Sequence, residues 1–170
     1  MLQFIIWGIL VVYLNYMAAL FASNRAKRIP DKPLPDILHD ILPQINNYVP
    51  DYLLLLCIIY IMIYRLDVVS LSDVTRLLGC LTLRPMFICM TTFPTCCVKP
   101  VNDDVYSKLF LNTHDLMFSG HTCLFLFFGH IIKGALGYGI VQFLFPLTLV
   151  ASRNHYTIDV VVAMLVYSHV

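Results

Sequence analysis

Residues 2–21, LQFIIWGILVVYLNYMAALF, form an uncharged apolar run near the start of the chain. A helix of about 20 residues, rising about 1.5 Å per residue, matches the hydrocarbon thickness of a bilayer. No basic segment precedes the run, and it is longer than the apolar part of a signal peptide, so we expect a membrane anchor that is retained. This segment predicts a membrane protein.

The apolar character continues through all 170 residues, of which 59% are hydrophobic and 12% charged, with a mean hydropathy of +0.79. These values lie far from those of soluble domains. The sequence predicts an all-α, polytopic membrane protein with a single domain over residues 1–170. Its six transmembrane helices are expected at residues 2–22, 52–71, 77–93, 116–132, 134–151 and 156–170. A net charge of +1, without a long basic run, argues against a nucleic-acid partner.

The connection between the first two predicted helices contains a short amphipathic segment. Its apolar residues recur at helical spacing, at Ile37, Leu38, Ile41, Leu42 and Ile45, beside the polar residues Asp36, His39 and Asp40. This pattern predicts a short helix in the membrane interface. The segment is either a lid over a site or a plain solvated connector.

If the helices alternate in direction, the first, third and fifth connections share one side of the membrane. That side then receives the residues best suited to chemistry, which are Asp36, His114, Asp115, His121 and His155. His130 and His169 fall at the far ends of their helices, where a structural or interfacial role is expected. We therefore predict a one-sided active site.

The basic residues are also unevenly divided between the two sides. Seven share the side of the polar cluster (Arg25, Lys27, Arg28, Lys32, Lys99, Lys108 and Arg153), and three lie opposite (Arg65, Arg76 and Lys133). By the positive-inside tendency, the polar cluster would face the cytosol.

The strongest chemical motif is RNHYTID, residues 153–159, near the end of the chain. His155 and Asp159 are four residues apart, so on a helix they share a face and the carboxylate can accept a hydrogen bond from one imidazole nitrogen. That bond fixes the tautomer and leaves the other nitrogen as a base or nucleophile. Both residues are predicted to be catalytic.

A second motif, Ser119-Gly120-His121, opens the fourth predicted helix. Glycine lets a ligand approach the backbone, serine adds a hydroxyl group, and a helix start favours an anion. Two histidines with a carboxylate can transfer a phosphoryl group without a metal: one attacks phosphorus, and the other, His121, protonates the leaving oxygen.

The cation that such a reaction needs is expected from Arg84 or Arg153. Arg84 lies within a predicted transmembrane helix, where an unpaired charge is costly, so it either serves the site or forms a structural ion pair with Asp115 or Asp159.

A zinc site is the rival use of His114, His121, His155 and Asp159. Phosphate is favoured because serine and glycine precede His121. The sequence therefore predicts no metal and no cofactor.

Four blocks of the sequence, in order, resemble the sphingomyelin synthases and related ceramide phosphotransferases, within the type 2 phosphatidic acid phosphatase superfamily. The blocks are KPLPDILHD (32–40), LRPMFICMTTFP (83–94), HDLMFSGHT (114–122) and NHYTIDVVVA (154–163). The resemblance implies a six-helix enzyme that transfers phosphocholine from phosphatidylcholine to ceramide, giving sphingomyelin and diacylglycerol through a phosphohistidine.

The resemblance also implies roles for individual residues. His155 would be the nucleophile, Asp159 its orienting partner and His121 the acid and base for the alcohols, with Asp115 near the head group. Ser119, Gly120, Arg84, Arg153 and Asp36 complete the predicted substrate-binding set. In contrast to the basic-residue count, the resemblance implies an active side that is lumenal or exoplasmic, in the Golgi, plasma or another endomembrane, and we follow it.

Departures from the wider superfamily pattern favour the transferase branch over a plain phosphatase. Leu77 and Leu149 stand where that pattern has a lysine and an arginine. Arg76 is single where the synthases have two arginines, and Thr113-His114 replaces a cysteine-glycine pair, so the donor head group stays open.

The alternatives are an ethanolamine or inositol head group, a diacylglycerol acceptor, and a lipid phosphatase or phospholipase C-like hydrolase. A non-enzymatic lipid-binding protein is a further alternative.

Overall fold

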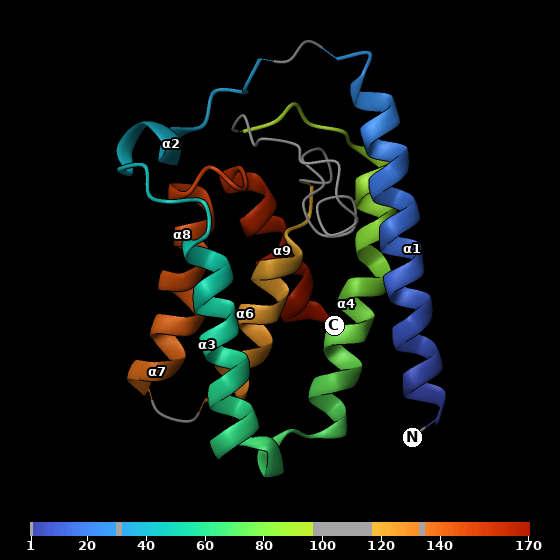
Figure 1. Cartoon of the computed structure of the whole chain (residues 1–170), viewed down its shortest axis with the longest axis vertical. Coiled ribbons are helices and arrows are strands. Elements are labelled where there is room, and N and C mark those ends of the chain that lie inside the picture. Colours follow the sequence, from blue (N-terminus) through green and yellow to red (C-terminus); the bar gives the residue numbers. More distant parts are fainter. Residues whose placement is uncertain (1, 30–31, 97–116, 133–134) are drawn as a thin grey trace.

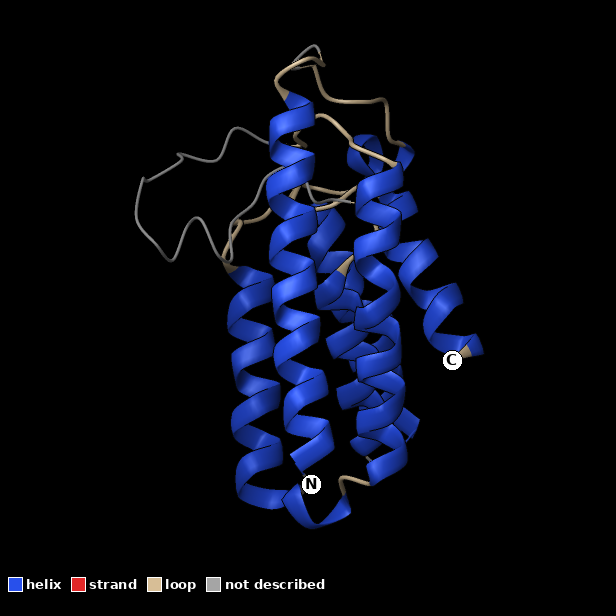
Figure 2. Ribbon diagram, turned by 90° about the vertical axis from the view of Figure 1, so that its right-hand side faces the viewer, coloured by secondary structure: helices blue, strands red, loops and turns tan. Residues whose placement is uncertain are grey.

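The computed structural model describes residues 2–29, 32–96, 117–132 and 135–170, and every regular element in them is helical (Figures 1 and 2). The elements are α1 (Leu2–Ala26), α2 (Ile37–Ile41), α3 (Val49–Tyr64), the 3₁₀ turn η1 (Leu66–Val68), α4 (Leu71–Met90), α6 (Gly120–Ile131), α7 (Ala135–Gly139), the π-helical turn η2 (Ile140–Leu144), α8 (Phe145–Ala151) and α9 (Thr157–His169). The prediction of an all-α fold is confirmed.

Each of the six apolar runs contains a helix, with α7, η2 and α8 following one another in the fifth run. The two largest errors in the predicted boundaries lie between the second and third helices. The second helix ends at Tyr64 rather than 71, and the third begins at Leu71 rather than 77, because Ser70 and Asp73 form a capping box. Asp73 N–H donates to Ser70 Oγ over 3.2 Å, and Ser70 N–H donates to Asp73 Oδ2 over 3.1 Å.

Within the described residues, only α1 is both long and apolar enough to cross a membrane by length and composition. The apolar stretches of α3, α6, α7–α8 and α9 are shorter, at 10–17 residues. Helix α4 has 20 residues but includes the charged side chains of Asp73, Arg76 and Arg84. The six-span topology therefore stays a prediction.

The outer surface of the bundle suits a lipid environment. Large apolar side chains are exposed along α1, including Ile5, Ile6 and Ile9, and along α3, including Leu56 and Ile63. Exposed apolar patches of this kind are rare on soluble monomers, whereas they are favourable against lipid. Together with the apolar α1 helix, they support a membrane protein.

Helix α1 packs along α4 through small and polar side chains (Figure 1). Ala18 and Ala22 lie against Ile88 and let the two backbones approach closely. Trp7 Nε1 donates to Thr82 Oγ1 over 2.9 Å. The rest of the core surrounds α6, whose buried phenylalanines are Phe125, Phe127 and Phe128.

The chain reverses direction between successive long helices, so the ends of α1, α4 and α8 and the starts of α3, α6 and α9 lie at one end of the bundle (Figure 1). The motifs around His121 and His155 are at that end. The predicted interfacial helix is α2, a single turn capped by Asp36, which lies at the same end.

Candidate active site

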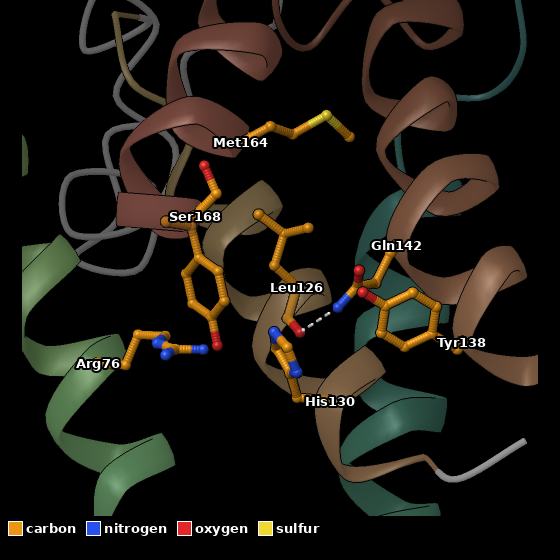
Figure 3. A pocket seen from close by; sticks show the side chains of 8 residues that line it. Arg76, Leu126, His130, Tyr138, Gln142, Met164 and Ser168 are labelled. Carbon is orange, nitrogen blue, oxygen red and sulfur yellow. Dashed lines mark hydrogen bonds between the residues drawn. The ribbon is translucent and has the colours of Figure 1, made fainter. Parts of the chain in front are cut away.

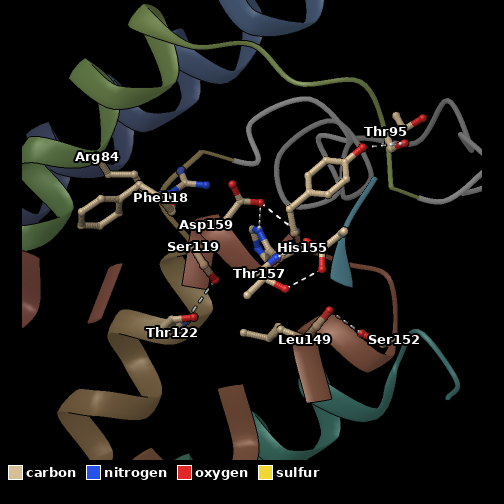
Figure 4. Close-up of polar contacts among 12 residues, drawn as sticks. Arg84, Thr95, Phe118, Ser119, Thr122, Leu149, Ser152, His155, Thr157 and Asp159 are labelled. Atoms are coloured by element: carbon tan, nitrogen blue, oxygen red, sulfur yellow. Dashed lines mark hydrogen bonds and ion pairs between the residues drawn. The ribbon is translucent and has the colours of Figure 1, made fainter. Parts of the chain in front are cut away.

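His155 lies in the turn between α8 and α9, and Asp159 is in the first turn of α9 (Figure 4). His155 Nδ1 is 3.4 Å from Asp159 Oδ2, which is longer than the roughly 2.7–3.2 Å of a typical hydrogen bond. The same carboxylate oxygen accepts the Tyr156 N–H at 2.9 Å, so the start of α9 holds it in place. With Nδ1 directed at the carboxylate, Nε2 is the imidazole nitrogen available for chemistry.

Both members of this pair are withdrawn from solvent, since 6% of His155 and none of Asp159 is exposed. The second carboxylate oxygen, Asp159 Oδ1, is buried and has no hydrogen-bond partner among the described residues. Buried polar atoms are nearly always paired, and an exception beside a buried histidine points to a functional group.

The backbone of His155 is fixed from two directions. Its N–H donates to Leu149 O over 3.2 Å, and its carbonyl oxygen is 3.0 Å from His39 Nε2. The His39 ring lies 5.6 Å from that of Tyr156. The segment around α2 therefore braces the turn that carries the predicted nucleophile.

The Ser119-Gly120-His121 motif forms the start of α6. Ser119 Oγ accepts the Thr122 N–H at 3.2 Å and caps the helix. Because of this cap, α6 begins at Gly120 rather than at 116 as predicted. Ser119 N–H donates to Asp159 O over 3.3 Å, which ties the starts of α6 and α9 together.

The two histidines, 34 residues apart in sequence, face each other. The ring centroids of His121 and His155 are 6.4 Å apart, with an angle of 61° between their planes. His121 is partly exposed, whereas His155 is buried. The structure therefore brings His121, His155 and Asp159 into one cluster.

Sequence reasoning missed one member of this cluster. Asp51, in the first turn of α3, has Oδ1 at 3.1 Å from His121 Nε2, with the two side chains 42% and 35% exposed. The signal available in the sequence was a carboxylate in the first turn of a helix that starts at the active end.

Arg84 lies beside this motif. Its Nε donates to Phe118 O and its Nη1 to Asn15 Oδ1, each over 2.9 Å. A Cβ atom on Gly120 would be 3.3 Å from Arg84 Nε, so the glycine leaves room for the guanidinium. This position is consistent with the predicted contact between Arg84 and a phosphate bound near His121.

Asn15 was also missed by sequence reasoning. Pro85 lacks an N–H group, so it cannot donate to the carbonyl of Leu81 one turn earlier in α4. Asn15 Nδ2 donates to that carbonyl over 2.8 Å while Asn15 Oδ1 accepts from Arg84. One amide thus satisfies the backbone group that Pro85 frees and positions Arg84.

Arg153 has a different environment. Its guanidinium donates to the carbonyls of His39, Leu42 and Val150, the last two over 3.2 and 3.3 Å. It therefore fastens α2 to the end of α8.

Asp36 also fastens α2. Its carboxylate accepts the N–H and hydroxyl of Thr157, each over 2.6 Å, and the N–H groups of Leu38 and His39. Burial alone would raise the pKa of Asp36, but the hydrogen bonds from Thr157 and His39 outweigh it and hold the pKa below its ordinary value.

Two backbone conformations mark the segments that lead into the histidines. Phe118 has a φ of 73° and Arg153 a φ of 59°, and within the described residues no other non-glycine residue has a positive φ. Such conformations are costly for L-residues, and they cluster at sites where the surrounding structure imposes them. Phe118 is fully buried, and its ring stacks on Phe87 at 5.3 Å.

Two predicted residues, Asp115 and His114, lie outside the described residues. Within residues 2–29, 32–96, 117–132 and 135–170, no group of three or more His, Cys, Asp or Glu side chains is arranged to hold a metal ion.

A protein-family model described as "PAP2 superfamily C-terminal" matches residues 113–170, which are 58 of the 170 residues and include both histidines and Asp159. The match supports the type 2 phosphatidic acid phosphatase superfamily, and so an enzyme that acts on phosphate esters of lipids. It does not single out the sphingomyelin synthases within that superfamily. No curated protein matches the chain.

Proposed function

We propose that this protein is a membrane lipid phosphotransferase that moves phosphocholine from phosphatidylcholine to ceramide. The observation that carries the proposal is the arrangement of two histidines at one end of an apolar helical bundle. His155 is paired with Asp159, and its ring centroid lies 6.4 Å from that of His121. A buried nucleophile opposite a second histidine suits a two-step displacement at phosphorus.

In the first step, His155 Nε2 attacks the phosphorus atom of phosphatidylcholine. A nitrogen–phosphorus bond forms as the bond from phosphorus to the glycerol oxygen breaks. His121 donates a proton to that oxygen, and diacylglycerol leaves. Asp159 accepts the hydrogen bond from Nδ1–H and stabilises the positive charge that develops on the His155 ring.

In the second step, His121 takes the proton from the primary hydroxyl of ceramide, and the oxygen attacks the phosphorus. The nitrogen–phosphorus bond breaks, so sphingomyelin is released and His155 is regenerated. Asp51 stabilises the protonated form of His121 in both steps. Arg84 neutralises the phosphate oxygens beside Gly120.

The surroundings of Leu149 support a transferase over a plain phosphatase. The side chain of Leu149 is 1% exposed and belongs to the core, and its carbonyl oxygen accepts the N–H groups of Asn154 and His155. An arginine, as in the wider phosphatase pattern, would place a charge in this apolar packing. The site therefore relies on Arg84 as its cation.

The proposal includes the membrane arrangement. The six helical runs cross the bilayer, and the active end faces the lumen or the outside of the cell, as the resemblance to the synthases implies. Apolar side chains on the outer faces of α1 and α3 support burial of the bundle in lipid.

The reaction is tested with purified protein in nanodiscs, supplied with phosphatidylcholine labelled in the head group and with ceramide. We expect labelled sphingomyelin and an equal amount of diacylglycerol. Parallel assays replace the donor with phosphatidylethanolamine or phosphatidylinositol, and the acceptor with diacylglycerol. Release of free phosphocholine without sphingomyelin would contradict the transferase and indicate a hydrolase.

A further inference from the structure

A cavity of about 240 Å³ lies between α4, α6, the α7–η2 segment and α9, apart from the candidate active site (Figure 3). Its polar lining comes from Arg76, His130, Tyr138, Gln142, Tyr167 and Ser168. His130 follows His121 by nine residues on α6, or about 13 Å along the helix axis. None of the lining residues belongs to the cluster around His155.

Tyr167 provides an unused hydrogen-bonding group in this cavity. The residue is only 2% exposed, and its hydroxyl is buried without a hydrogen-bond partner among the described residues. Buried tyrosine hydroxyls usually find a partner. The hydroxyl is covered in this structure, so a ligand would supply a partner as the side chains around the cavity adjust to it.

The cavity also holds a fixed positive charge. Arg76 Cζ is 5.9 Å from the centre of the Tyr167 ring. The His130 ring stacks on Tyr167 at 5.8 Å and contacts Tyr138 at 6.0 Å. In Figure 3 the Arg76 guanidinium and the His130 ring are directed into the same space.

The side of the cavity formed by η2 has an unusual backbone conformation. Gln142 is on the π-helical turn η2, and its Nε2 donates to Leu126 O over 3.1 Å. A Cβ atom on Gly129 would be 2.3 Å from Gln142 Cγ, so the glycine is what lets η2 lie so close to α6. Single π-helical turns within helices are frequently found at functional sites.

The lining favours an anion over a cation. Arginine, tyrosine, serine and glutamine offer N–H and O–H donors, and no carboxylate from the described part of the chain lines the cavity. The volume of about 240 Å³ is large enough for a small head group.

We propose that this cavity binds a phosphate group, carried by an anionic lipid head group or by a free phosphate ester. The Arg76 guanidinium contacts the phosphate oxygens, and the Tyr167 hydroxyl donates the additional hydrogen bond. The site is separate from the catalytic cluster, and the proposal does not depend on the reaction proposed above.

The test uses the full chain and four variants, one of which is His155→Ala in the candidate active site. Arg76→Gln removes the cation, and Tyr167→Phe removes only the hydroxyl. Arg28→Gln is the matched control, because Arg28 is exposed beyond the end of α1 and the change in net charge is the same. Lipid binding is counted by native mass spectrometry with phosphatidic acid, and a second arm titrates glycerol phosphate by calorimetry. Thermal unfolding of each variant verifies that it is folded.

We expect Arg76→Gln to weaken binding at least about tenfold and Tyr167→Phe about three- to tenfold, as for the loss of a hydrogen bond to a charged group. Arg28→Gln and His155→Ala should retain the binding. Binding in the phosphatidic acid arm identifies a lipid head group, and binding with glycerol phosphate alone identifies a free ester. The proposal is overturned if neither ligand binds, if the two cavity variants bind like Arg28→Gln, or if His155→Ala alone abolishes binding. If Arg76→Gln does not fold, the comparison of ligand binding by Tyr167→Phe and by Arg28→Gln tests the proposal with the same expected and contradicting results.

Discussion

Asp51 Oδ1 lies 3.1 Å from Nε2 of His121, so the histidine opposite the predicted nucleophile has a carboxylate partner of its own. Each histidine of the site is thus paired with an aspartate from a helix start, His121 with α3 and His155 with α9. The two pairs differ in exposure. Asp159 is fully buried, whereas the Asp51 side chain is 42% exposed.

Asp51→Asn keeps the shape of the side chain but removes its charge, so the protonated form of His121 loses its stabilisation. We expect kcat for phosphocholine transfer to fall about ten- to hundredfold with a smaller change in KM. Asp67→Asn is the control, because Asp67 is exposed in η1 at the opposite end of the bundle. Equal rates for the two variants would exclude a role for Asp51.

Gly120→Ala tests the position of Arg84. The added methyl group would lie 3.3 Å from Arg84 Nε, which is held by hydrogen bonds to Phe118 and Asn15 and has little freedom to withdraw. We expect transfer activity to fall about tenfold, as for a displaced charge on the phosphate.

The control for this substitution is Gly8→Ala, since no atom lies within 4 Å of a Cβ atom at Gly8 on α1. It should leave activity unchanged and stabilise α1 by about 0.5–1 kcal/mol, because alanine is the better helix former. Full activity in Gly120→Ala would show that Arg84 does not need its present position.

Asn15→Ala should destabilise the protein by about 1–3 kcal/mol, because Leu81 O and Arg84 both lose a partner. Pro85→Ala restores an N–H group that can reach the carbonyl of Leu81. In the Pro85→Ala background, the cost of Asn15→Ala should therefore be smaller. The measurement is a double-mutant cycle of unfolding free energies in detergent, and strict additivity would contradict the proposed link.

The hydrogen bonds by which Asp36 links α2 to Thr157 at the start of α9 should depend on the ionised form of the carboxyl group. Because the pKa of Asp36 in the folded protein lies below its ordinary value of 3.8, ionisation favours the folded state. That stabilisation is complete above the ordinary value and is lost as the pH falls through the lower, folded-state pKa.

Asp36→Asn should therefore destabilise the protein at neutral pH, by about 1–2 kcal/mol, and the difference from the wild type should shrink as the pH is lowered below 3.8. Thermal unfolding of the wild type and the variant across the pH range measures the loss of stability at neutral pH and its decrease on acidification. A difference that grows on acidification has the opposite sign and would refute the assignment.

The sequence predicted the helices and the contact between His155 and Asp159 because both follow from local spacing. Apolar runs of helical length define the bundle, and the four-residue separation predicted that His155 and Asp159 would meet, although His155 lies in the turn before α9 rather than on the helix itself. The start of α4 was missed although its Ser70–Asp73 capping box is a local pattern, because the charged first turn was excluded from the apolar run.

Other parts of the site depend on tertiary packing, which local spacing does not specify. Asp51 meets His121 only because α3 and α6 start at the same end of the bundle. Asn15 reaches Arg84 across the α1–α4 contact. The positive φ angle of Phe118 results from the contacts of a fully buried ring and from a carbonyl held by Arg84, which no sequence pattern specifies.

In the proposed reaction, His155 carries the phosphocholine group between donor and acceptor. The direct measurement is mass spectrometry of the intact chain and its peptides after mixing with phosphatidylcholine in the absence of ceramide. We predict one phosphocholine group on the peptide that contains His155, removed when ceramide is added with formation of an equal amount of sphingomyelin. The adduct should be absent from His155→Ala and slow to form in Asp159→Asn. Sphingomyelin formation by His155→Ala, or an adduct on another residue, would show that His155 is not the carrier.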